Sequence, residues 1–197
     1  MNQPKRVVCY GDSNTYGYDP RGVLGGRYPE DALWTTLIGS DDRIVINEGQ
    51  NGRTIPKFPW EKSEALHIMK SHGPVELIIV MLGTNDIIVH WDFKAADVAA
   101  CMEYFLSELK TANADTQVLL IAPPAIESGQ FQMEPRLLVE SQKFGDCYRA
   151  VADRLGIAFA DASDWQVEAA FDGVHFSEKG HAAFARGLGQ KLTEMGF

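Results

Sequence analysis

Three side chains typical of nucleophilic acyl transfer lie in two short polar segments near opposite ends of the chain. Ser13 follows an apolar run and Gly11-Asp12, while Asp172 and His175 flank Gly173 and Val174. A serine hydroxyl attacks well only when a base accepts its proton, and an imidazole titrates in the range that suits this task. A carboxylate can accept the second ring N–H and stabilise the imidazolium that forms. The pattern indicates Ser13 as a nucleophile, His175 as its base and Asp172 as the group that orients the base.

Two other glycine-marked turns offer hydrogen-bond donors for a developing negative charge. Asn51-Gly52-Arg53 and Gly83-Thr84-Asn85-Asp86 each follow an apolar run. A glycine at position 52 allows the backbone to approach a ligand closely. We therefore expect the backbone N–H groups of Ser13 and Gly52 and the side-chain amide of Asn85 to form an oxyanion hole.

The elements that position these residues can be predicted from hydrophobic periodicity. Apolar runs predict strands at 7–10, 43–47, 76–82, 117–121 and 157–160, and amphipathic spacing predicts helices at 31–38, 61–70, 98–109, 137–155 and 178–192. Asp31 and Ser177 are the expected N-caps of the first and last helix. The segment from Tyr16 to Pro29 is rich in Gly, Tyr and Pro and predicts a loop.

Strands that alternate with helices predict one doubly wound α/β domain over residues 1–197, with a five-stranded parallel sheet covered on both faces. Parallel strands place their carboxyl ends at one edge of the sheet, where ligands of such folds bind. The three glycine-marked turns therefore share an edge, and the 171–176 segment can return to it. The fold prediction and the site prediction support each other.

Composition limits the classes of partner. The chain has 197 residues and a formal net charge of -9, without a Lys/Arg cluster, which argues against nucleic acid and anionic membranes. No segment has the length of a membrane span or the pattern of a secretory signal. Cys9, Cys101 and Cys147 lack metal-binding or redox spacing, so we expect free thiols in a reducing compartment. We predict a cytoplasmic protein that acts on a small molecule without metal or cofactor. Its oligomeric state is left open.

The four polar blocks together resemble those of the SGNH (GDSL-type) hydrolases, in the same order and across nearly the whole chain. The blocks are Gly11-Asp12-Ser13, Gly52, Gly83-Thr84-Asn85-Asp86 and Asp172-Gly173-Val174-His175. The resemblance implies a flavodoxin-like three-layer fold, a Ser13–His175–Asp172 triad and an oxyanion hole from Ser13, Gly52 and Asn85. Asn14 stands where the GDSL pattern has leucine, and we expect it to contribute no mechanistic group.

Within that family the chain looks most like bacterial arylesterase and acetyl-esterase members. The similarity lies in Tyr16-Gly17-Tyr18 and in the run from Met81 to Asp86. It implies a serine esterase acting on short acyl groups, acetyl foremost, carried by aryl, alkyl or sugar alcohols. Acyl transfer to an alcohol would use the same residues. An alternative from another class is a non-catalytic flavodoxin-like module that binds a small anion.

Several neighbouring residues have simpler interpretations. Asp12 and Asp86 are expected to hold turn backbones. Arg53 could orient an anionic substrate group or form a surface salt bridge. We expect core packing for three tryptophans that could instead line a pocket (Trp34, Trp60, Trp91), and a surface or packing position for His181. We assign no function to His67, His72 and His90. The chain lacks G-x-S-x-G, a P-loop and G-x-G-x-x-G.

Overall fold

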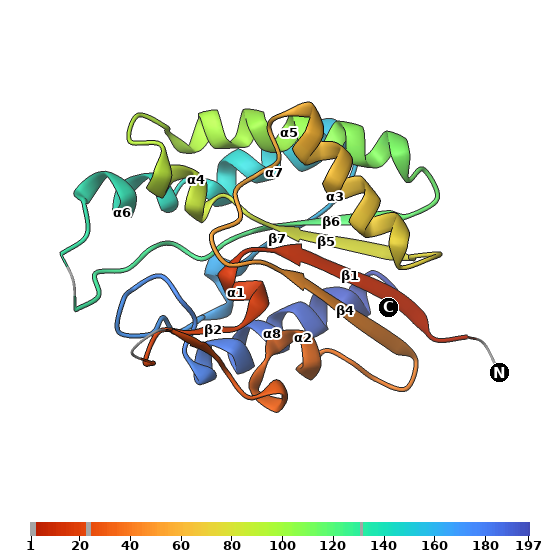
Figure 1. Cartoon of the computed structure of the whole chain (residues 1–197), viewed down its shortest axis with the longest axis horizontal. Coiled ribbons are helices and arrows are strands. Elements are labelled where there is room, and N and C mark those ends of the chain that lie inside the picture. Colours follow the sequence, from red (N-terminus) through yellow and green to blue (C-terminus); the bar gives the residue numbers. More distant parts are fainter. Residues whose placement is uncertain (1–2, 23–24, 131) are drawn as a thin grey trace.

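The computed structural model describes residues 3–22, 25–130 and 132–197. Its centre is a five-stranded sheet in the order β4-β1-β5-β6-β7, and every pairing in it is parallel (Figure 1). The strands are β1 (Lys5–Gly11), β4 (Arg43–Gly49), β5 (Leu77–Met81), β6 (Gln117–Ala122) and β7 (Ala158–Asp161). All five predicted strands are present, with ends shifted by a residue or two. Every residue of β5 is buried, as expected for a central parallel strand.

Helices cover both faces of this sheet, which confirms the predicted three-layer fold. Figure 1 shows α3 (Pro59–Ser71), α5 (Ala95–Ala112) and α7 (Phe144–Leu155) on one side, and α2 (Trp34–Leu37) and α8 (Glu178–Glu194) on the other. Alternate residues of a strand point to opposite faces of the sheet, so they pack in two separate hydrophobic cores. Ile78 and Val80 pack in the core with Phe105 of α5, whereas Leu77 and Ile79 pack in the core with Phe184 of α8.

The segment predicted as a loop from Tyr16 to Pro29 contains a short antiparallel strand pair. β2 (Tyr18–Asp19) pairs with β3 (Gly26–Arg27). The Tyr18 ring lies 4.6 Å from the His175 ring, measured between centroids. Strands of two residues leave no alternating pattern, so periodicity cannot reveal this pair within the predicted loop.

Two predicted helices are each divided. The first consists of a 3-10 turn η1 (Glu30–Ala32) and α2, separated by Leu33 in an extended conformation, and Pro29 rather than Asp31 precedes the turn. The predicted 137–155 helix consists of α6 (Pro135–Ser141) and α7. The end of α6 is anchored elsewhere, because the Ala95 N–H donates to Glu140 at 2.9 Å and the Ile126 N–H donates to Ser141 Oγ at 3.0 Å. The chain therefore turns before α7 begins.

The structure confirms one further local prediction and contradicts another. Ser177 caps α8, since its Oγ accepts the Gly180 N–H at 3.0 Å. Trp34 is buried, but Trp60 and Trp91 are 65% and 81% exposed, so core packing was the wrong expectation for those two. Among the described residues, no helix is long and apolar enough to cross a membrane.

The three cysteines are free thiols, as expected. Cys9 is buried in β1, and burial raises the pKa of its thiol. Cys101 on α5 and Cys147 on α7 are partly buried, and burial raises the pKa of both. All three thiols are free. Thiols that resist ionisation are poor nucleophiles and poor metal ligands.

Candidate active site

Ser13 lies at the first position of a one-turn helix that begins where β1 ends. This helix, α1 (Ser13–Tyr16), is capped by the Asp12 carboxylate, which accepts the Asn14 N–H at 2.9 Å. The expected backbone-holding role of Asp12 is therefore present. Asp12 is almost fully buried, and burial raises its pKa to about 6, although the Asn14 hydrogen bond and the nearby His175 act in the opposite direction.

The three residues singled out as a nucleophile, a base and an orienting acid form one hydrogen-bonded chain. Ser13 Oγ lies 3.0 Å from His175 Nε2, and His175 Nδ1 lies 2.6 Å from Asp172 Oδ2. The second carboxylate oxygen accepts the backbone N–H groups of Val174 and His175 at 3.1 and 3.0 Å. Burial raises the pKa of Asp172, but these hydrogen bonds from His175 and Val174 outweigh it, so the net shift is downward. Asp172 is ionised at neutral pH.

Gly173 makes the tight turn between Asp172 and His175 possible. Its φ is +75°, and a Cβ at this position would lie 2.2 Å from the carbonyl oxygen of Glu127. The Gly173 carbonyl in turn accepts the Glu127 N–H at 2.9 Å. The turn is thus packed against the backbone that follows β6, which fixes the approach of His175 to Ser13.

The three groups expected to form an oxyanion hole lie in adjoining segments. Gly52, with φ of +75°, lies in the turn after β4, and a Cβ there would meet nothing within 4 Å. Asn85 lies on α4 (Thr84–Val89), a short helix in a segment predicted only as a turn, and its Nδ2 donates to the Arg53 carbonyl at 3.0 Å. Within the described parts of the chain, no protein group accepts the N–H of Ser13 or of Gly52. Both N–H groups are therefore without an acceptor among the described residues, as an oxyanion hole requires.

Arg53 forms no salt bridge with a described carboxylate, so the surface salt bridge, one of its two expected roles, is absent. One guanidinium nitrogen, Nη1, donates to the carbonyls of Gly11, at 2.9 Å, and of Glu48. The guanidinium also lies 4.0 Å from the centroid of the Tyr10 ring. Arg53 ties the ends of β1 and β4 together, and with them the segments that carry Ser13 and Gly52.

A buried ion pair beside Asn85 could not be read from the sequence. Asp86 is fully buried, and its carboxylate accepts the Ile55 N–H at 3.1 Å and lies 2.7 Å from Lys57 Nζ. Burial raises the pKa of Asp86, which Lys57 partly counters. Asp86 therefore holds a different backbone segment from its own turn. Lys57 Nζ also lies 3.2 Å from His90 Nε2, a contact that the sequence does not indicate.

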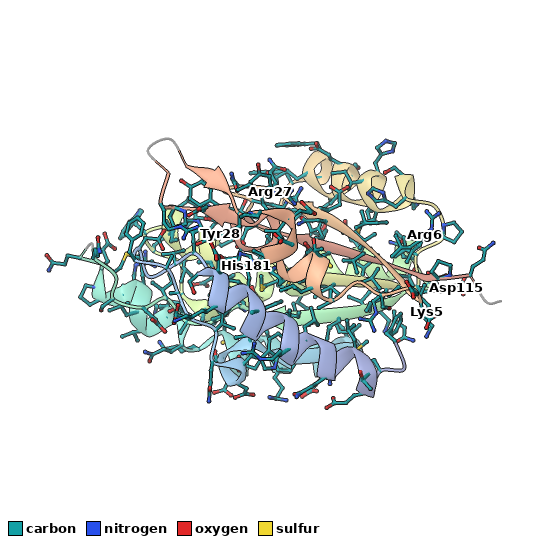
Figure 2. The ribbon with its side chains drawn as sticks, turned by 90° about the horizontal axis from the view of Figure 1, so that it is seen from below. Lys5, Arg6, Arg27, Tyr28, Asp115 and His181 are labelled. Atoms are coloured by element: carbon teal, nitrogen blue, oxygen red, sulfur yellow. The ribbon has the colours of Figure 1, made fainter. Side chains whose placement is uncertain are left out.

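Two further histidines have structural positions. His72 Nε2 lies 2.6 Å from a Glu48 carboxylate oxygen, which sequence analysis did not foresee. His181 is buried near the start of α8, and Figure 2 shows it next to Tyr28, the ring centroids being 5.3 Å apart. Burial lowers the pKa of His181 to about 4. Packing, rather than a surface position, is the correct interpretation of His181. In the described ranges, no three His, Cys, Asp or Glu side chains form a metal-binding group.

A cavity of ≈ 260 Å³ adjoins the Gly52 turn. Its wall combines polar groups with the exposed ring of Trp60 and includes Gly52, Arg53, Thr54 and Glu64. The exposed ring of Phe58 lies parallel to that of Trp60, with centroids 6.4 Å apart. Trp60 therefore lines a pocket, which was the second of its two expected roles.

A connected serine, histidine and aspartate at the carboxyl edge of a parallel sheet is an arrangement suited to nucleophilic acyl transfer. Residues 9–183 match the model of the GDSL-like Lipase/Acylhydrolase family. The chain belongs to this family, and it is a hydrolase. Family membership sets aside the alternative of a non-catalytic binding module.

Solved structures support the same assignment. The native M. smegmatis aryl esterase superposes with a TM-score of 0.87 at 25% identity, covering 96% of this chain and 99% of that chain. A carbohydrate acetylesterase family member from Sinorhizobium meliloti gives 0.85 at 28%, covering 97% and 98%. A putative arylesterase from Agrobacterium tumefaciens str. C58 gives 0.84 at 28%, covering 96% and 99%. A search of the curated proteins found no match.

Proposed function

We propose that this hydrolase cleaves short-chain carboxylic esters through an acyl-enzyme formed on Ser13. The observation that carries the proposal is the chain of contacts from Ser13 Oγ to His175 Nε2 and from His175 Nδ1 to Asp172. A serine alone is a weak nucleophile, and this chain supplies its base and the group that orients the base.

In the proposed mechanism, Ser13 Oγ attacks the ester carbonyl carbon while His175 Nε2 takes the hydroxyl proton. The carbonyl oxygen becomes an oxyanion, which the N–H groups of Ser13 and Gly52 and the amide of Asn85 stabilise. The tetrahedral intermediate collapses, His175 gives its proton to the leaving alcohol, and the acyl group stays on Ser13. A water molecule, deprotonated by His175, then attacks the acyl-enzyme and releases the acid. Asp172 stays ionised throughout and stabilises the imidazolium.

The proposed substrates are acetyl and other short acyl esters of aryl, alkyl or sugar alcohols. Support comes from the similar structures, which are named as aryl esterases and a carbohydrate acetylesterase. The cavity next to Gly52 is a suitable place for the alcohol part, because a sugar presents C–H groups to an aromatic ring and hydroxyls to polar groups. Transfer of the acyl group to an alcohol instead of water remains an alternative with the same residues. Adding methanol and measuring methyl ester formation would distinguish the two.

We also propose that the protein works in the cytoplasm as a small-molecule enzyme that needs no metal or cofactor and does not act on nucleic acid or at membranes. Three unpaired cysteines fit a reducing compartment. A net charge of -9 disfavours binding to polyanions. Whether copies of the chain associate is a separate question, which sedimentation would answer.

The test of the proposed function is hydrolysis of p-nitrophenyl acetate by wild-type protein and by Ser13→Ala. Loss of the nucleophile should lower kcat by about 1,000-fold or more. Ser163→Ala is the matched control, because Ser163 is an exposed serine that has no part in the proposed mechanism. If Ser13→Ala keeps more than about a tenth of wild-type activity while Ser163→Ala is unchanged, Ser13 is not the nucleophile.

A further inference from the structure

Asn14, the residue after Ser13, bonds to the backbone on both sides of His175. Asn14 Nδ2 donates to the Val174 carbonyl at 3.1 Å, and Asn14 Oδ1 accepts the Phe176 N–H at 2.9 Å. Val174 and Phe176 are the two neighbours of His175 in the chain. Both polar ends of one amide are therefore used, one on each side of the histidine.

Asn14 is itself fixed from several directions. Its side chain is buried, with only 6% of the residue exposed. Its backbone N–H donates to the Asp12 carboxylate, and its carbonyl accepts the indole N–H of buried Trp34 at 2.9 Å. A buried amide with every strong hydrogen-bonding group paired has one well-defined orientation. Asn14 can thus hold the 174–176 segment in a fixed position relative to α1.

We propose that Asn14 is a positioning residue that holds His175 at hydrogen-bonding distance from Ser13. This inference rests on the proposed function, since it concerns the geometry of the same nucleophile and base. Leucine, which the GDSL pattern has at this position, has neither a donor nor an acceptor. The expectation that position 14 contributes no mechanistic group still applies to the reacting atoms, and the proposed role adds the positioning of the backbone around His175. Asn14 touches no reacting atom and acts through the backbone on both sides of His175.

The loss of such a residue should have a particular kinetic effect. The Asn14 side chain is buried and its amide bonds to the backbone of Val174 and Phe176, so we expect it to make no contact with substrate. KM should therefore stay within about twofold, whereas kcat should fall about 10- to 100-fold because the base is misplaced. The hydrogen bond between His175 Nδ1 and Asp172, 2.6 Å long, offers a second readout. Its proton should give a low-field proton NMR signal, which should broaden once the 174–176 segment is free to move.

The experiment compares Asn14→Leu with Asn47→Leu, using p-nitrophenyl acetate kinetics and low-field NMR of the intact protein. Asn47 is a matched control because its side chain also bonds to α1, donating to the Thr15 carbonyl at 2.8 Å and accepting the Gly49 N–H at 2.9 Å, but does not reach the His175 segment. We expect Asn14→Leu to lower kcat and broaden the NMR signal, and Asn47→Leu to change stability only. If Asn14→Leu does not fold, Asn14→Ser serves, with Asn47→Ser beside it.

Two results would overturn the proposal. One is a kcat for the Asn14 variant within about twofold of wild type with an unchanged low-field signal. The other is an equal loss of kcat in the Asn47 variant, since Asn14 would then act only through the stability of α1. Both results differ from failure of the proposed function. If the proposed function were wrong, Ser13→Ala would keep its esterase activity, whatever the Asn14 variants do.

Discussion

Replacing Lys57 by methionine tests whether the buried ion pair beside Asn85 holds the site together. Lys57 Nζ lies 2.7 Å from Asp86 Oδ1, and the Asp86 side chain is 0% exposed. Methionine fills similar space but removes the charge. The Asp86 carboxylate would then keep only the Ile55 N–H among the hydrogen bonds described here.

The structure sets the size of the effect. Removing one partner of a buried ion pair costs about 3–5 kcal/mol, because the other charge remains without compensation. The Lys57 side chain is 21% exposed, so water can replace part of its effect, and we expect about 3 kcal/mol at neutral pH.

The loss of stability in Lys57→Met should depend on pH. Burial raises the pKa of Asp86, and Lys57 lowers it, so the variant should have a still higher folded-state pKa. Between the unfolded and folded pKa values the folded protein then holds more protons than the unfolded protein. Stability of the variant should therefore fall as pH rises through this window and recover as pH falls, because a protonated carboxyl needs no counter-charge.

The assay is urea unfolding of wild type and Lys57→Met at pH 5 and pH 7. Lys191→Met is the control, since Lys191 pairs with the exposed Glu194 at 3.4 Å and should cost less than about 1 kcal/mol. Adding Asp86→Asn to Lys57→Met should restore most of the loss. The reasoning is refuted if Lys57→Met costs no more than Lys191→Met, or if the variant becomes more stable as pH rises.

Three further predictions concern the site and its surroundings. Asn85→Ala should lower kcat about 100- to 1,000-fold through loss of an oxyanion donor, and a change below about tenfold in p-nitrophenyl acetate hydrolysis would exclude that role. Trp60→Ala should lower kcat/KM for an acetylated sugar about 2- to 10-fold more than for p-nitrophenyl acetate. The control Trp91→Ala removes a tryptophan that is also exposed but does not line this cavity, and it should affect both substrates alike. Equal behaviour of the two variants would remove the cavity from sugar binding. Burial lowers the pKa of His181 in the folded protein to about 4, whereas the pKa in the unfolded chain is about 6.5. Between these pH values the unfolded chain binds a proton that the folded protein does not. The free energy of unfolding should therefore fall by up to about 3 kcal/mol as pH falls from about 6.5 towards 4. His181→Phe should flatten this pH dependence in thermal unfolding, and an unchanged acid limb would show that His181 is not its source.

The sequence allowed the sheet and the main site residues to be predicted because both depend on local patterns. Apolar runs such as β5 identify buried strands, and polar residues directly after such runs must collect at one edge of a parallel sheet. Asp172 and His175 are close in the chain, so their contact follows from a short turn. The approach of Ser13 to this pair follows from topology.

The remaining features depend on contacts between distant segments, which no local pattern records. The side chain of Asn14 bonds residues about 160 positions away, and Arg53 satisfies backbone carbonyls rather than a carboxylate. The break between α6 and α7 has the same origin, because Glu140 and Ser141 bond to other segments. The amphipathic spacing continues across that break, since both helices face the same core.

The most direct test of Ser13 as the nucleophile is mass spectrometry of the protein quenched in acid during turnover of p-nitrophenyl acetate. The proposed mechanism predicts a peptide containing Ser13 that carries one acetyl group, and no such adduct in Ser13→Ala. Turnover with an acetyl group found on another residue, or with no adduct even when a p-nitrophenol burst is seen, would contradict it.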